Sequence, residues 1–330
     1  MTTTSPAAIS KGTPLLIRIR RWNGLGGLLP LVLLIALYFS ISIKSPGFLS
    51  AGSMQSVATQ AAPLVFLAAG LTPIIILGGI DLSLAALTTL SSILIVQLLP
   101  PLGLGGLLLV LLITTAFGAV VGFIHAVAQV PSFVVTLGAF GLYGGLALQI
   151  SNATNQPLTK HLDLVTWTTS YIAGIPASFV AAVAFVILIW LAMTYLPLGR
   201  YTYAVGASES AALMSGIRTV RLRVGLFALA GLSAGLAALP LVGRTTYGSP
   251  SLANTLLLPT IAAVVVGGTA ISGGVGSVLR SLVGALIVTV VQVGLVVVGV
   301  NAVLQNVVFG AMIVIAVALT TDRSKLPTIK

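Results

Sequence analysis

Apolar residues fill most of the chain in long runs that are separated by short polar interruptions. The runs recur at about the 20-residue length that crosses a bilayer as a helix. They consist of continuous Leu, Val, Ile and Ala, without the alternation that the strands of a membrane barrel require. The pattern predicts an all-α, polytopic membrane protein with about ten transmembrane helices. The expected spans are 24–43, 56–77, 83–99, 104–127, 132–150, 177–197, 222–243, 256–271, 277–298 and 303–320.

Composition supports a bilayer setting and excludes several classes of protein. Hydrophobic residues make up 58% of the 330 positions and charged residues 6%, which no soluble domain tolerates. There is no cysteine, so disulfides and cysteine-based metal or redox sites are excluded. His125 and His161 have no acidic cluster near them, so we expect interfacial residues and no metal site. The net charge of +11 is scattered along the chain, which favours the lipid bilayer and no nucleic acid as partner.

The basic residues predict the orientation of the chain in the membrane. With the N-terminus inside, twelve basic residues fall on the cytoplasmic side and three outside, namely Lys44, Lys160 and Arg244. Both termini are then cytoplasmic. The division is a basic tail at 1–23, a transmembrane domain at 24–320 and a second tail at 321–330. The domain has an outside segment at 151–176 and a cytoplasmic loop at 198–221.

Two glycine pairs interrupt the apolar runs in a similar way. PIIILGGIDLS (residues 73–83) and AAVVVGGTAIS (residues 262–272) each end an apolar helix with Gly-Gly and reach a serine four residues later. The second copy lies 189 positions after the first, which favours two bundles repeated in the same orientation, although a chance match of small residues is the alternative. The predicted helix breaks are at Gly78, Gly79, Gly267 and Gly268.

Asp81 follows the first glycine pair, between two apolar runs where burying a charge costs free energy. The second copy has Ala270 at the position of Asp81, so the bend itself does not require an acid. In a structural interpretation, Asp81 or Ser83 accepts hydrogen bonds from free backbone N–H groups at the next helix start. In a functional interpretation, this carboxylate faces a polar pathway. It is one of four acids in the chain, with Asp163, Glu209 and Asp322.

The cytoplasmic loop LGRYTYAVGASESAALMSGIRTVRLRV, residues 198–224, breaks the apolar sequence with polar and small residues. It predicts a short helix within 206–217, with Ser208 as its N-cap and Glu209 in the first turn, where the helix dipole favours an acid. The helix should stop at Gly216. Its small-residue face suits insertion into a cleft on another protein, and an ordinary interfacial helix is the alternative.

Four motifs in this order resemble a known family. GGIDLS, VPSFVVTLGAFGLYGGLAL (residues 130–148), the loop above and IAAVVVGGTAISGGVGSVLRSLVGALI (residues 261–287) resemble permease subunits of bacterial ATP-binding-cassette (ABC) importers for ribose, xylose and similar sugars. The resemblance covers about 40–330. It implies a cytoplasmic ATP-binding subunit, a second permease that is identical or homologous, and a periplasmic solute-binding protein.

The resemblance also assigns residues. The pattern that begins at Gly199 is the family's coupling helix, the segment that contacts the ATPase, and the implied coupling residues are Gly206, Ser208, Glu209, Ala211, Ala212, Ser215, Gly216 and Ile217. Candidate residues of the solute path are Asp81, Ser83, Phe133, Thr136 and Tyr143. The chain departs from the family pattern at 256–259, where an acid is common, and at 144–145, where a basic residue often occurs. These departures put the usual range of sugars in question.

Chemical motifs separate transport from catalysis. The sequence has no G-x-x-x-x-G-K-[ST] loop, so ATP and Mg²⁺ are expected on the partner ATPase, and this chain carries no cofactor. There is no catalytic triad or carboxylate pair at membrane depth, so we expect no catalytic residues and no enzyme. The favoured function is an importer permease for a sugar or similar polar solute. The alternatives are a branched-chain amino acid or nucleoside ABC permease, an ion-coupled secondary transporter and a membrane scaffold.

Overall fold

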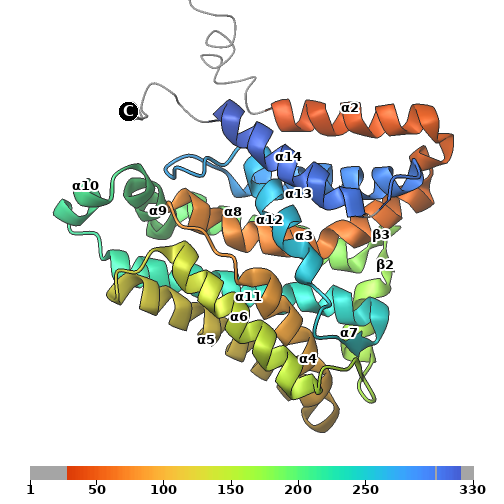
Figure 1. Ribbon diagram of the computed structural model, residues 1–330, viewed down its shortest axis with the longest axis horizontal. Helices are drawn as coiled ribbons and strands as arrows, with labels where there is room; N and C mark the ends of the chain where they lie inside the picture. The colour runs from red at the N-terminus through yellow and green to blue at the C-terminus, as the bar shows by residue number, and fades with distance from the viewer. Residues whose placement is uncertain (1–27, 302, 321–330) are drawn as a thin grey trace, which may run out of the picture.

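The computed structural model describes residues 28–301 and 303–320, and it is an all-helical bundle, as predicted (Figure 1). The predicted tails at 1–23 and 321–330 and the first residues of the first span lie outside the described residues. The long helices lie at the predicted spans. They are α2 (Leu29–Lys44), α3 (Ala51–Ile76), α4 (Leu84–Leu102), α5 (Leu104–Val127), α6 (Ser132–Ser151), α8 (Ala177–Tyr195), α11 (Thr219–Thr245), α12 (Leu257–Val266), α13 (Val278–Val297) and α14 (Val303–Thr320).

Seven of these helices are long and apolar enough to cross a membrane, namely α3, α4, α5, α6, α8, α11 and α13. The apolar helices at Leu29–Lys44, Asn254–Val266 and Leu304–Ala318 are shorter, so the count of ten spans stays a prediction. The segment 256–271 differs most from its prediction. Its α-helix α12 has ten residues and ends at Val266, because the glycine pair that follows terminates it. Ten residues rise only about 15 Å, half the hydrocarbon thickness.

The core forms around α3 and α11. Every residue of α3 from Ala61 to Ile76 is buried, which is expected for a helix that is apolar on all sides and surrounded by others. Helix α11 packs against α5 through glycines. A Cβ atom added to Gly231 would lie 3.1 Å from the Cα of Gly118, so the two backbones approach as closely as membrane helices allow. The α5–α11 contact is therefore a tight seam.

Short elements lie at the two ends of the bundle (Figure 1). One end carries α9 (Pro197–Ala207) and α10 (Glu209–Met214). The other end carries α7 (Asp163–Thr166), the 3₁₀ helix η2 (Trp167–Thr169) and two antiparallel strand pairs. These pairs are β1 (Gln156–Pro157) with β4 (Tyr247–Gly248) and β2 (Tyr171–Ile172) with β3 (Ile175–Pro176). Two further 3₁₀ helices are η1 (Pro46–Leu49), after α2, and η3 (Asn254–Leu256), before α12.

Candidate functional site

Helix α3 ends in a glycine C-cap at the first predicted break. Gly78 has φ 93°, the left-handed conformation that glycine adopts without strain. Its N–H donates to the carbonyl of Ile75 at 2.9 Å, and the N–H of Gly79 donates to that of Ile74 at 2.9 Å. These are the two hydrogen bonds of a Schellman motif, so the last carbonyls of α3 are satisfied locally.

The second break has the same geometry with its register shifted by one residue. Here the second glycine of the pair, Gly268, has positive φ, 89°. It donates to Val265 at 2.8 Å, and Thr269 donates to Val264 at 3.2 Å. The equivalent glycines are therefore Gly78 and Gly268, 190 positions apart instead of the 189 that alignment of the sequence motifs indicates. Both copies therefore end a helix with a positive-φ glycine and the same pair of backbone hydrogen bonds.

Asp81 lies buried between the first break and α4, with 3% of its surface exposed. One carboxylate oxygen, Oδ1, accepts from the backbone N–H of Ser83 at 2.8 Å and from its hydroxyl at 2.6 Å. Ser83 itself makes no side-chain cap with α4. The carboxylate thus satisfies a backbone donor just before the helix, which lipid cannot do.

Helix α6 completes the surroundings of this segment. The backbone N–H of Ile80 donates to the hydroxyl of Ser132 at 2.9 Å, and the hydroxyl of Thr136 lies 3.4 Å from the carbonyl oxygen of Ile80. Tyr143 is buried two turns further along and donates to the carbonyl of Phe117 at 3.2 Å. Phe133, by contrast, is 52% exposed on another face of α6.

The candidate path residues therefore divide into two groups. Asp81, Ser83, Thr136 and Tyr143 are all buried where α6 covers the break and α4, whereas Phe133 points away from them. Sequence reasoning missed Ser132, which is the hydrogen-bond partner of the break. Its position directly after Pro131, at the start of a helix, was the available signal.

The cytoplasmic loop forms the short helix predicted within 206–217, which is α10, and a second helix, α9, that precedes it. Helix α9 runs to Ala207 and α10 begins at Glu209, because Ser208 adopts an extended conformation (φ −163°) and interrupts the helix between them. The hydroxyl of Ser208 accepts from the N–H of Ala211 at 3.4 Å, which is the N-cap geometry. Gly216 has φ 78° and terminates α10 in a further Schellman motif, with bonds from Gly216 to Leu213 and from Ile217 to Ala212.

Helix α10 exposes a different surface from the one its alanines suggested. Ala212 is buried, and Ala211 is exposed. The large apolar side chains of Leu213 and Met214 are 52% and 91% exposed. Sequence reasoning missed both, since their spacing alone does not show which face of a six-residue helix is covered. An apolar pair on a segment flanked by Arg200 and Arg218 is typical of a protein contact.

Gly206 lies in α9 and joins this segment to the end of α3 and to the loop that follows the second helix break. A Cβ on Gly206 would collide with the carbonyl oxygen of Ile76 and lie 2.6 Å from the nitrogen of Gly274. That nitrogen donates to the same Ile76 carbonyl at 2.8 Å. A Cβ on Gly273 would lie 3.0 Å from the Cα of Gly78. Three segments far apart in the sequence thus meet backbone to backbone, and this contact is the glycine junction.

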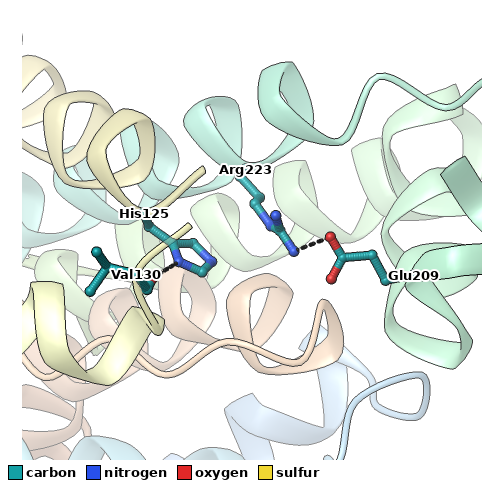
Figure 2. A network of polar contacts seen from close by, with 4 residues as sticks. All are labelled: His125, Val130, Glu209 and Arg223. Atoms are coloured by element: carbon teal, nitrogen blue, oxygen red, sulfur yellow. Dashed lines mark hydrogen bonds and ion pairs between the residues drawn. The ribbon is translucent and has the colours of Figure 1, made fainter. Parts of the chain in front are cut away.

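Glu209 makes an ion pair within the chain. Its Oε1 lies 2.6 Å from an Nη of Arg223, near the start of α11. Figure 2 shows this pair close to His125, whose Nδ1 lies 2.7 Å from the carbonyl oxygen of Val130. Among the residues that the structure describes, no group of three His, Cys, Asp or Glu is placed to hold a metal ion.

A polytopic bundle with two broken helices and an exposed apolar segment at one end has the features of a membrane transport component. The family described as branched-chain amino acid transport system / permease component matches residues 53–317, and the chain belongs to this family of ABC transporter permeases. It is a multi-pass inner-membrane protein.

Curated relatives align with almost the whole chain. The "Probable ABC transporter permease protein YphD" of Escherichia coli (strain K12) is 37% identical over 89% of this chain and 90% of that protein. The ribose import permease protein RbsC of Bacillus subtilis (strain 168) is 34% identical over 90% and 92%, respectively. RbsC of Escherichia coli (strain K12) is 32% identical over 89% and 93%. No solved structure matches the chain at a significant level.

Proposed function

We propose that this chain is the permease subunit of an importer that moves a sugar or a similar small polar solute into the cytoplasm. The observation that carries the proposal is α10, a capped helix that presents Leu213 and Met214 at the end of the bundle opposite the 151–176 segment. The names of the curated relatives, which include ribose import permeases, support a sugar as the solute.

The proposal includes the sides of the membrane and the partners. The end with α9 and α10 faces the cytoplasm, because Arg200, Arg218 and Arg221 flank it and cytoplasmic loops are enriched in such residues. A separate ATP-binding subunit, which holds ATP and Mg²⁺, docks there. A periplasmic binding protein delivers the solute at the opposite end, where 151–176 lies. A second permease, identical or homologous, completes the assembly.

Transport would use the glycine junction. Because Gly206 meets the end of α3 at Ile76 and, at Gly274, the loop that follows the second break, a displacement of α9 and α10 would move both segments together. The buried group around Asp81 lies beside the first break, and we propose that it borders the solute path near its cytoplasmic end. Broken helices are where transporters place such sites. Phe133 belongs to the proposed path only if a second permease covers its exposed face.

A second candidate solute is a branched-chain amino acid. The description of the matched family favours it, and so do the departures from the sugar-permease pattern at 144–145 and 256–259. An ion-coupled transporter that uses Asp81 is the third possibility. The energy source of transport by the reconstituted complex separates the third possibility from the first two, since it is ATP in the first two cases and an ion gradient in the third, and the solute that is taken up separates the first from the second.

The docking test uses Met214→Asp with Met214→Leu as its matched control. Placing a charge at the centre of an apolar contact should prevent the ATP-binding subunit from co-purifying, while membrane insertion is unchanged, because Met214 touches little of its own chain. Met214→Leu keeps the apolar surface and should co-purify like the unmodified protein. Co-purification and ribose uptake are measured together. Normal co-purification of Met214→Asp would refute the assignment of α10 as the docking helix.

A further inference from the structure

The Glu209–Arg223 ion pair has a role that stability does not explain. The segment 197–224 carries four arginines, and Glu209 is the one acid within it. It bonds to Arg223, although Arg218 and Arg221 lie nearer to it in the sequence. Figure 2 shows the side chains extending toward each other from separate elements.

Helix α10 has few other attachments to the bundle. It has six residues, and Ala212 is its buried side chain. Its main packing partner is α9, which precedes it directly. Among the residues that the structure describes, this ion pair is the polar side-chain interaction that links α10 to α11, and the other side-chain hydrogen bonds of α10 stay within residues 208–215. A displacement of α10 therefore reaches α11 through this pair or through the four-residue connection, residues 215–218, that follows it.

Arg223 lies in the most tightly packed seam of the bundle. A Cβ added to Gly122 of α5 would lie 3.1 Å from the carbonyl oxygen of Arg223 and 2.8 Å from the Cβ of Phe227. One turn further into α11, the ring of Phe227 packs against His125 with centroids 5.8 Å apart. The backbone that bears Arg223 thus cannot shift without moving α5 and α11 as a unit.

Helix α11 carries such a shift to the other end of the molecule. Its 27 residues span about 40 Å, the full thickness of a bilayer with its headgroups. Near its far end, a Cβ on Gly243 would lie 2.5 Å from the carbonyl oxygen of Val165 and would also collide with the hydroxyl of Thr168. Backbone contact thus joins α11 directly to α7 and η2, within the 151–176 segment.

We propose that the Glu209–Arg223 pair is a strut that transmits movement between the ATPase-docking helix α10 and the 151–176 segment, with α11 as the helix that connects them. Glu209 and Arg223 are positioning residues in this scheme, since neither is assigned to contact solute or nucleotide. The inference rests on the proposed function for the identity of the two partners. The mechanical link between α10 and α11 is a property of this chain alone.

A role in transmission fits the exposure of the pair. The Glu209 side chain is 47% exposed, so solvent weakens the contribution of the pair to folding stability, whereas the Arg223 side chain is 15% exposed and packed in the bundle. Removing or reversing the charge of Glu209 should therefore leave the bundle assembled and change how closely α10 moves with α11. A pair that served only to stabilise the fold would behave in the opposite way, lowering abundance and sparing the coupling.

The experiment compares Glu209→Arg, Arg223→Glu and the double exchange, with Arg221→Glu as the control for charge at an exposed neighbouring arginine. Glu209→Gln removes the charge without reversing it, so it still tests the ion pair if a charge reversal prevents folding. In the reconstituted full complex, ribose uptake per ATP hydrolysed, and the stimulation of hydrolysis by the binding protein, should each fall about fivefold or more in the single reversals. The double exchange should restore both to within about twofold, and Arg221→Glu should change neither.

A second measurement tests the strut in the permease alone, without the ATP-binding subunit or the binding protein. A spin label at Ser210→Cys in the full-length permease, which has no native cysteine, reports the mobility of α10. The single reversals and Glu209→Gln should increase this mobility, and the double exchange should lower it again. If the unmodified permease fails to co-purify with an ATPase, the proposed function is wrong. The mobility of the spin label still tests whether the ion pair links α10 to α11. Unchanged mobility, or single reversals that couple normally, would overturn the strut.

Discussion

Substitutions of Asp81 distinguish a structural carboxylate from one whose charge drives transport. In the structure, one oxygen of Asp81 accepts from both the N–H and the hydroxyl of Ser83. Asparagine presents a carbonyl oxygen at the same place, so both donors keep their acceptor. Leucine has a similar size and no acceptor, so it leaves the buried N–H of Ser83 without a partner.

The two substitutions differ in their expected energies. A buried donor left unpaired costs about 1–3 kcal/mol, which Asp81→Leu incurs for the backbone N–H alone. Hydrogen bonds to a charged acceptor are about twice as strong as neutral ones, so Asp81→Asn loses about 1 kcal/mol. That loss is offset in part because a charge no longer has to be buried. Asp81→Asn should therefore fold nearly normally, and Asp81→Leu should be markedly less stable.

The assay measures membrane abundance, thermal unfolding in detergent, ribose uptake and ATP hydrolysis for both variants. Asp163→Asn, at an exposed acid in the first turn of α7, is the control for loss of a charge. We expect Asp81→Asn to retain most of the uptake and Asp81→Leu to be depleted from the membrane. If Asp81→Asn is as abundant as the unmodified protein but abolishes uptake as completely as Asp81→Leu, the structural account is refuted and the charge itself is required.

Two further predictions concern the glycine junction and the topology. Gly206→Ala places a methyl group against the carbonyl of Ile76 and should prevent stable assembly, whereas Gly225→Ala, which faces open space in α11, should raise thermal stability by about 0.5–1 kcal/mol. Equal unfolding temperatures for the two variants would contradict the junction. A membrane-impermeant thiol reagent added outside should label Thr159→Cys and miss Ser208→Cys in otherwise cysteine-free protein. The reverse labelling would invert the orientation and remove the docking argument.

Local sequence determined the helices and where they stop. Apolar runs of bilayer length place the long helices because unpaired backbone groups are so costly in lipid that any crossing segment must be helical. The ends after Ile76 and Val266 were predictable for a similar local reason, since a Gly-Gly pair after an apolar run permits a left-handed residue. The cap at Ser208 and the stop at Gly216 depend on neighbouring residues alone, and they too follow from the sequence.

Tertiary contacts determined the backbone conformation at the second helix break and which distant segments touch. Which glycine of each pair adopts positive φ was not readable from two similar motifs, and the structure shifts the register of the second copy to Gly268. The contact of Gly206 with Ile76 and Gly274, and the pairing of Glu209 with Arg223, depend on how segments distant in the chain pack. Hydropathy specifies that a helix is buried in a bilayer, but nearly uniform apolar faces do not specify its neighbours. Close backbone approach at glycines determines which helices are neighbours.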